Sequence, residues 1–212
     1  MKAVLFDMDG VLIDTEKLYN ICWRQASGEL GYSLSDDEIL SLRSCDISVA
    51  APYFGGEDGY RSVRTRRKEL MAALIEKEGI SLKKGADKVS SRLHEMGLVT
   101  AVVTATPLKR AIGYLEETGL RDGFDTVLSA KDVKRGKPFP DVYIHACEML
   151  GLPPSECIAV EDSPNGLRSA HDAGLFTVMV PDLTPPDSET EKYTHAVAED
   201  LDALVETVRK ML

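Results

Sequence analysis

The chain lacks several features that would place it in large classes of protein. None of its apolar runs approaches the length of a membrane-spanning helix, and the first run stops at Asp7, which is too short for a signal peptide. Positive charge is scarce, because 25 Lys and Arg residues face 35 Asp and Glu residues and leave a net charge of -10. This balance argues against nucleic acid or an anionic membrane as a partner. We therefore expect a soluble, cytoplasmic protein, and only local positive charge would allow it a small anionic ligand.

Paired cysteines and repeats are also missing. The four cysteines are scattered, and no two of them form a C-x-x-C pair: Cys22, Cys45, Cys147 and Cys157. Such a distribution is typical of reduced thiols and suggests no zinc site. The sequence contains no internal repeat and no low-complexity segment. Its 212 residues suffice for one sizeable core and a smaller appended unit.

From residue 83 onward, amphipathic helices alternate with short apolar strands. The predicted strands are 3–6, 98–103, 124–128, 157–160, 176–180 and the short edge strand 196–197. The predicted helices between them are 86–96, 106–119, 140–150, 163–174 and 200–211, and Thr106, directly before Pro107, is the expected N-cap of the second. Strands separated by helices of this size are typical of a parallel sheet with helices on both faces. The sequence thus predicts an α/β fold with a Rossmann-like core.

The segment 16–80 differs from the rest of the chain. It is helix-prone and charged, has no strand pattern, and is interrupted by glycines at 55–59 before a predicted helix at 60–77. A further helix is expected to begin at Asp14 or Thr15 and to end near Leu30. We predict a core domain formed by 1–15 and 81–212 and a small helical domain formed by 16–80, inserted after the first strand, with hinges near Thr15 and at 81–85.

Acidic and hydroxyl side chains follow the strands of the predicted sheet. Asp7 and Asp9 come directly after the first strand, and Thr104 ends the second. Glu161 and Asp162 follow the strand at 157–160. The carboxyl ends of parallel strands meet at one edge, where such sheets bind ligands. We therefore expect these side chains to converge on one crevice.

A lysine completes the predicted crevice. Lys137 lies in the loop 134–140, where two prolines stiffen the backbone. Oxygen ligands with a nearby lysine suit a phosphate group held by Mg²⁺. Each residue alone has a plainer explanation, since acids often cap helices and lysines often lie in solvent. One shared site explains these three strand ends and the loop lysine better than four separate coincidences do.

The same segments resemble motifs of the haloacid dehalogenase superfamily, in the branch of β-phosphoglucomutase and its sugar-phosphatase relatives. They are Asp7-x-Asp9-Gly10-Val11-Leu12-x-Asp14-Thr15-Glu16, then Thr104 after an apolar run, then Gly136-Lys137-Pro138-x-Pro140-Asp141 with Tyr143, and last Glu161-Asp162-Ser163-x-x-Gly166. Their order and spacing agree with that branch over the whole chain. The resemblance implies that the segment 16–80 is an α-helical cap domain and that the protein is a monomer or a weak dimer.

The resemblance also implies an activity. The protein would be a Mg²⁺-dependent phosphatase for a small phosphorylated metabolite, a sugar phosphate, and would form an aspartyl-phosphate on Asp7. Asp9 would act as general acid and base. The implied metal ligands are Asp7, the backbone carbonyl of Asp9, and Asp162, with Glu161 either a further ligand or a partner of Lys137. The implied phosphate-binding residues are Thr104, Ala105 and Lys137, assisted by Thr106.

Alternatives to a phosphatase remain open at this point. A phosphohexomutase of the same branch would have a histidine early in the cap, where this chain has Leu18-Tyr19-Asn20, and all four histidines lie outside 16–80. The mutase arginine is displaced as well, since Arg43 sits in a poorly matching segment, 42–47. We therefore favour the phosphatase. A phospho-accepting signalling module and a catalytically inactive binding protein are remoter alternatives.

Two features of the segment 16–80 bear on the substrate. Tyr19 and Trp23 are four residues apart on the first predicted helix, where they either line the substrate pocket or pack within the cap. The basic run Arg64-x-Arg66-Arg67-Lys68 suggests a grip on a distal phosphate. Successive helical residues point in different directions, so at most one or two of them can face the cleft. A solvated face is the favoured interpretation of this run.

Overall fold

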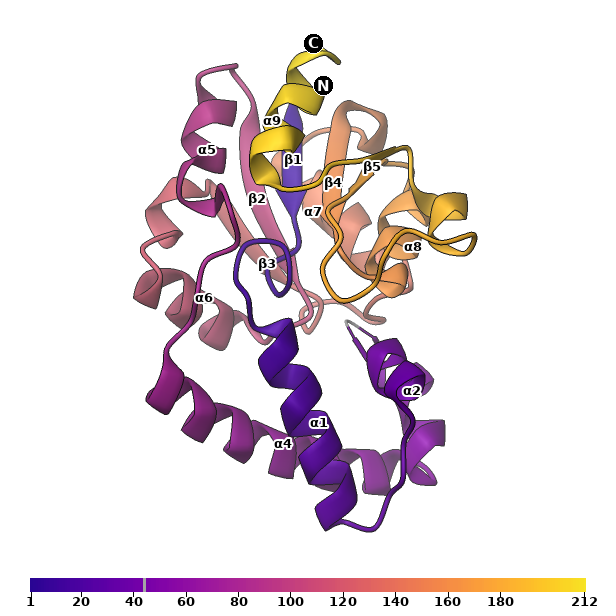
Figure 1. Ribbon diagram of the computed structural model, residues 1–212. Coiled ribbons are helices and arrows are strands. Elements are labelled where there is room, and N and C mark those ends of the chain that lie inside the picture. Colours follow the sequence, from indigo (N-terminus) through magenta and orange to yellow (C-terminus); the bar gives the residue numbers. More distant parts are fainter. Residues whose placement is uncertain (44) are drawn as a thin grey trace.

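A single parallel sheet forms the centre of the computed structural model, which describes residues 1–43 and 45–212 (Figure 1). Ser44, within the predicted segment 42–47, lies outside the described residues. The strands are β1 (Ala3–Phe6), β2 (Val99–Thr104), β3 (Thr126–Ser129), β4 (Cys157–Glu161), β5 (Phe176–Met179) and β6 (Ala196–Val197). Their order is β3-β2-β1-β4-β5-β6, and Ala3 of β1 pairs with Val99 on one side and Cys157 on the other. The strand order reverses beside β1, which is where α/β sheets bind ligands.

Helices cover both faces of the sheet. Helices α5 (Ala86–His94), α6 (Leu108–Glu117) and α9 (Leu201–Arg209) pack on the face that carries Val4 and Phe6. Helices α7 (Asp141–Leu150) and α8 (Pro164–Asp172) pack on the face that carries Ala3 and Leu5. This alternation follows from the two-residue period of a strand. Short 3₁₀ turns complete the core at η2 (Arg121–Gly123), η3 (Pro154–Glu156) and η4 (Thr190–Tyr193). The predicted α/β fold is confirmed.

The segment between β1 and α5 forms a helical unit with a hydrophobic cluster of its own. It contains α1 (Glu16–Glu29), α2 (Asp36–Ser41), α3 (Ile47–Ala50), η1 (Ala51–Phe54) and α4 (Glu57–Glu78). Trp23 stacks on Phe54 and Tyr60, with ring centroids 5.7 and 6.0 Å apart. Figure 1 shows this unit beyond the sheet edge at which β1 ends. The separate cluster supports the division into a core and a cap, which stays a prediction. None of the described helices combines the length and the apolar character needed to cross a membrane.

The two chain crossings between the sheet and the helical unit lie side by side. The backbone N–H of Asp14 donates to the carbonyl of Ser81 at 2.8 Å, and that of Lys83 donates to Leu12 at 3.0 Å. The Lys83 ammonium adds an ion pair of 2.7 Å with Asp182. The crossings thus meet where the sequence predicts hinges, near Thr15 and at 81–85.

Candidate active site

The turn after β1 brings two carboxylates against the end of β4. Asp7 continues the ladder, since its N–H donates to the carbonyl of Val160 at 2.9 Å. Gly10 then turns the chain with φ of +84°, and a Cβ placed there would lie 2.4 Å from the Asp162 carboxylate. Only glycine combines that conformation with so close an approach. The requirement for glycine directly after Asp9 therefore comes from the site itself.

Lys137 is fully buried between two carboxylates. Its Nζ donates to Asp7 Oδ1 at 2.8 Å, to Glu161 Oε1 at 2.6 Å and to the carbonyl of Val103 at 3.0 Å. The Tyr143 hydroxyl also donates to Glu161 Oε1, at 2.6 Å. An ammonium has three N–H donors, and all three are used here. In this arrangement Lys137 contributes positive charge and fixes the two carboxylates, with no N–H left for a further acceptor.

A second cationic side chain, that of Arg43 from the helical unit, contacts a carboxylate at this sheet edge. Arg43 is 5% exposed, and its Nη1 donates to Asp162 Oδ2 at 2.8 Å while Nη2 donates to the Thr184 hydroxyl. The Asn165 side chain from α8 holds the same segment by donating to the backbone carbonyl of Arg43 at 2.8 Å. The segment around Arg43 is thereby fixed to the sheet edge.

Each of the three acids at the ends of β1 and β4 in this group has one carboxylate oxygen with no hydrogen-bond partner among the described residues. These oxygens are Asp7 Oδ2, Glu161 Oε2 and Asp162 Oδ1, all buried. The three carboxylates offer ligand atoms within 4.8 Å of one another. Burial raises the pKa of Glu161 to about 7 although Lys137 opposes the shift, and burial also raises the pKa of Asp162. Three acids paired with two cations leave a negative excess, so this group of residues fits a divalent metal ion with oxygen ligands.

Asp9 points away from these acids and is surrounded by hydroxyl groups. Thr15 Oγ1 donates to Asp9 Oδ1 at 2.5 Å, Thr106 Oγ1 donates to Oδ2 at 2.9 Å, and Thr104 Oγ1 lies 3.5 Å from Oδ2. Burial and the charge of Asp7 raise the pKa of Asp9 to about 6, although the Thr15 and Thr106 hydroxyls favour the ionised form. Asp9 is therefore able to change protonation near neutral pH.

The prediction that Thr106 caps a helix was wrong. Helix α6 begins at Leu108 after Pro107, and no side chain caps it. The Thr106 hydroxyl instead donates to Asp9, while its N–H donates to Thr104 Oγ1 at 3.0 Å. Ala105, between the two threonines, lines the pocket beside Asp9. The segment after β2 is thus shaped by the site and not by the helix that follows.

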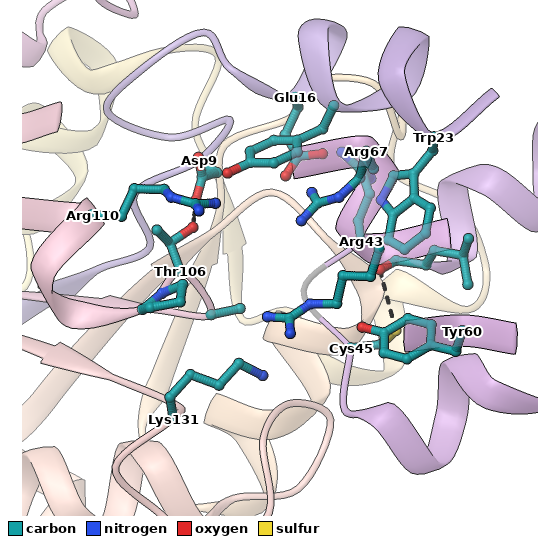
Figure 2. Close-up of a pocket in the computed structure, with 15 residues that line it drawn as sticks. Asp9, Glu16, Trp23, Arg43, Cys45, Tyr60, Arg67, Thr106, Arg110 and Lys131 are labelled. Carbon is teal, nitrogen blue, oxygen red and sulfur yellow. Dashed lines mark hydrogen bonds between the residues drawn. The ribbon is translucent and has the colours of Figure 1, made fainter. Parts of the chain in front are cut away.

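Figure 2 shows a pocket between the helical unit and the sheet edge, with Asp9 and Thr106 on one wall. Tyr19 and Trp23 both line it and are also almost fully buried. The guanidinium of Arg67 lies over both rings, 4.6 Å from the centroid of Tyr19 and 4.8 Å from that of Trp23. Both interpretations of this aromatic pair therefore apply, because the rings pack within the helical unit and also face the pocket.

The basic run on α4 divides between pocket and solvent. Arg64 and Arg67, three residues apart, line the pocket. Arg66 points to the outside and pairs with Glu29 at 2.5 Å. The limit of one or two residues facing the cleft is met, but the interpretation of the run as a solvated face was wrong for Arg64 and Arg67.

Three further pocket residues were missed or undervalued from the sequence: Arg43, Arg110 and Lys131. Lys131 follows β3 closely, so the rule that finds Thr104 at a strand end would also have found it. Arg110 lies in the first turn of α6, after the Thr104–Thr106 segment. Arg43 carried no local signal, because its partner Asp162 is 119 positions away in sequence.

Comparison with known proteins assigns the family. Residues 4–180 match the family model described as haloacid dehalogenase-like hydrolase. The chain belongs to this family. The predicted family and the predicted enzyme class, a phosphatase of the haloacid dehalogenase superfamily, are confirmed. The predicted residue roles, substrate and mechanism stay proposals.

The relatives of this haloacid dehalogenase-like hydrolase include named phosphatases and a β-phosphoglucomutase. Hexitol phosphatase A of Escherichia coli is 31% identical over 201 residues, which cover 92% of this chain and 91% of the relative. Phosphorylated carbohydrates phosphatase of Thermotoga maritima is 29% identical over 183 residues, 82% of each chain. The crystal structure of CbbY from Rhodobacter sphaeroides in complex with phosphate shares 26% identity and a TM-score of 0.77 over 95% of both chains. A β-phosphoglucomutase from Clostridium difficile, at 21% identity and a TM-score of 0.82 over 99% of this chain and 96% of that one, shares the fold.

Proposed function

We propose that the chain is a Mg²⁺-dependent phosphatase that hydrolyses a small phosphorylated metabolite, a sugar phosphate, through an aspartyl-phosphate intermediate. One observation carries the proposal: Asp7 is ion-paired with Lys137, while Asp9, two residues on, has a pKa raised to about 6. A nucleophilic carboxylate benefits from a cation that holds it in place, and a general acid benefits from a raised pKa, so the contrast suits these two roles. The phosphatases named above, at about 30% identity, support the same activity.

Asp7 is the proposed nucleophile. Its carboxylate attacks phosphorus, the bond to the leaving oxygen breaks, and Asp9 gives its proton to that oxygen. Water then attacks the phosphorus of the aspartyl-phosphate, Asp9 takes the proton from the water, and inorganic phosphate leaves with Asp7 regenerated. The ion pair with Lys137 at 2.8 Å keeps the Asp7 carboxylate in place for both steps.

The proposed metal ligands are Asp7, Asp162 and the backbone carbonyl of Asp9. Glu161 is a further candidate, because Oε1 is used by Lys137 and Tyr143 while Oε2 has no partner. When bound, Mg²⁺ offsets the negative charge shared by these acids and the phosphate group. In the proposed phosphate site, Thr104 and Ala105 contact the phosphoryl oxygens and Lys137 contributes charge.

The test of the activity is phosphate release from a panel of sugar phosphates and an aryl phosphate, with Mg²⁺ and with chelator. We expect repeated turnover with Mg²⁺ and none with chelator. A single labelling of the protein without turnover would indicate a phospho-accepting module instead. A hexose 1-phosphate supplied with a bisphosphate primer tests for mutase activity. An isomerised product without free phosphate would overturn the proposal of a phosphatase.

Binding of Mg²⁺ is expected to stabilise the fold, since the ion relieves the repulsion among three buried carboxylates. At 100-fold excess over its dissociation constant, the free energy of unfolding should rise by about 2.7 kcal/mol, which thermal unfolding measures. Asp162→Asn should lose most of this increase, whereas Asp172→Asn at the end of α8, whose side chain is partly exposed, should keep it. Equal stabilisation of both variants would place the ion elsewhere.

The pH profile of kcat/KM tests Asp9. Activity should fall as pH rises through its pKa, because the protonated carboxyl gives the proton to the leaving group. Thr106→Val removes a donor to ionised Asp9, so its pKa should rise and the descending limb should move to higher pH. The ionisation of the substrate is common to both enzymes and cancels in the comparison. Thr65→Val, which alters an exposed hydroxyl on α4, serves as control, and an unmoved limb in Thr106→Val would contradict the role of Asp9.

A further inference from the structure

Four cationic side chains converge on the pocket of Figure 2 without an ion pair of their own. Arg64 and Arg67 come from α4, Arg110 from α6, and Lys131 from the segment after β3. Figure 2 shows Arg67, Arg110 and Lys131 extending into the same space from different elements. In the part of the chain that the structure describes, none of the four has a carboxylate within ion-pair distance.

This arrangement is unusual for so acidic a chain. Elsewhere the arginines have partners close by, such as Arg66 with Glu29, Arg92 with Asp202 and Arg135 with Asp141. With 35 acidic residues against 25 basic ones, carboxylates are plentiful, yet within the described residues none forms an ion pair with these four side chains, although Asp9 and Glu16 line the same pocket. The positive field extends to Lys68, whose pKa is lowered by burial and then by the charges of Arg64 and Arg110. A pocket lined by several cations without ion-pair partners attracts an anionic ligand.

Arg67 is the fixed part of the group. It is 9% exposed, lies over the rings of Tyr19 and Trp23, and has a buried Nε without a hydrogen-bond partner. Aromatic faces hold a guanidinium in place without neutralising it. Arg67 therefore lines the pocket as a cation that is held in place without an ion pair among the described residues.

The group makes no ion pair with the three acids that form the candidate metal site, Asp7, Glu161 and Asp162. Arg43 and Lys137 pair with these acids by direct contact, with N–O distances of 2.8 Å to Asp162 and to Asp7. Arg64, Arg110 and Lys131 contact none of those acids and share the pocket with Asp9 and Ala105. A ligand whose phosphoryl group lies at Asp9 would extend across the pocket toward them.

We propose that the substrate carries a second anionic group, a phosphate or a carboxylate, remote from the phosphoryl group that is removed, and that Arg64, Arg110 and Lys131 bind it. This proposal rests on the proposed function and narrows its substrate class from sugar monophosphates to doubly anionic sugar derivatives. Arg67, which lines the same pocket, adds positive charge. Guanidinium groups suit both candidates, since they pair with phosphate and carboxylate oxygens through two N–H groups at once.

The experiment compares ligands that differ by one anionic group. The probes are glucose 6-phosphate with glucose 1,6-bisphosphate and 6-phosphogluconate, fructose 6-phosphate with its 1,6-bisphosphate, and ribulose 5-phosphate with its 1,5-bisphosphate. For at least one set, the second anionic group should raise kcat/KM by about tenfold or more, the effect of one charged hydrogen bond. The bisphosphate and 6-phosphogluconate arms distinguish phosphate from carboxylate.

Variants assign the effect to the pocket. Arg64→Ala and Lys131→Ala should each reduce the ratio of kcat/KM between the doubly and singly anionic ligands by about tenfold. Arg66→Ala, on the same helix but paired with Glu29 outside the pocket, should leave the ratio as in the parent chain. Circular dichroism verifies that the variants are folded. A ratio near one in every set, or one that Arg64→Ala and Lys131→Ala leave unchanged, would overturn the proposal.

Measurements of ligand affinity test this proposal independently of the proposed function. Dissociation constants of the same ligands are measured by calorimetry on Asp7→Asn, which lacks the proposed nucleophile. If the parent chain hydrolyses nothing, including the aryl phosphate, a preference of Asp7→Asn for the doubly anionic ligands would still support the second site. Equal affinity within every set would overturn the site, whatever the catalytic result.

Discussion

Replacing Asp7 by asparagine is expected to abolish turnover and to leave the fold intact. The amide cannot form an acyl-phosphate, and loss of a nucleophile from a concerted site typically lowers kcat by about 10⁴-fold or more. The amide oxygen can still accept the hydrogen bond from Lys137, which is 2.8 Å long in the parent chain. The measurement is steady-state phosphate release with Mg²⁺, accompanied by urea unfolding.

A matched variant shows whether the effect belongs to this aspartate alone. Asp14→Asn makes the same chemical change in the same loop, but the Asp14 carboxylate pairs with Lys17 at the start of α1. It should retain most of the activity. Turnover by Asp7→Asn within tenfold of the parent would refute the nucleophile and with it the aspartyl-phosphate mechanism.

Lys137→Met is expected to have the largest effect on stability. The lysine is fully buried and neutralises Asp7 and Glu161, so its loss leaves two buried carboxylates without a cation. Removing one partner of a buried ion pair typically costs about 3–5 kcal/mol, which is a large share of the stability of a domain. Urea unfolding monitored by circular dichroism measures the change.

The loss should depend on pH in a defined direction. Glu161 has a folded pKa of about 7, raised above its ordinary value of 4.5, so the native state binds more protons than the unfolded state and stability falls as pH rises through this window. The charge of Lys137 lowers the pKa of Glu161, so this pKa is higher in the variant. Stability then continues to fall up to a higher pH. The variant should therefore be more strongly destabilised at pH 8 than at pH 5.

A second substitution tests this cause. Lys137→Met combined with Glu161→Gln should regain part of the lost stability at pH 8, because the glutamine carries no charge and still accepts a hydrogen bond from Tyr143. A double variant as unstable as Lys137→Met at both pH values would show that lost packing, and not unpaired charge, explains the effect.

The sequence was sufficient to predict the sheet and the residues at its strand ends. Asp7, Asp9, Thr104, Glu161 and Asp162 lie together because parallel strands share one edge, and this rule needs no tertiary detail. Lys137 was found through its motif and its loop prolines. Its complete burial and its three acceptors could not be predicted, because they depend on packing between β2, β4 and α7.

The residues from the helical unit were harder to predict. Arg64 and Arg67 share a helix face by their spacing, but nothing local says whether that face meets solvent or the sheet edge. Arg43 depends on a contact across 119 positions, and Thr106 was assigned to a cap because the Thr-Pro pair is a common helix start. In each case the deciding interaction is tertiary and leaves no local pattern.

The ion pair between Arg43 and Asp162 links two equilibria. One carboxylate oxygen holds an arginine of the helical unit, while its other oxygen belongs to the proposed metal site. An ion bound there would draw charge from the carboxylate and weaken its hold on the guanidinium. By thermodynamic reciprocity, displacement of Arg43 tightens ion binding by the same factor. The loading of the proposed ion and the docking of the segment around Arg43 would thus be coupled through a single side chain.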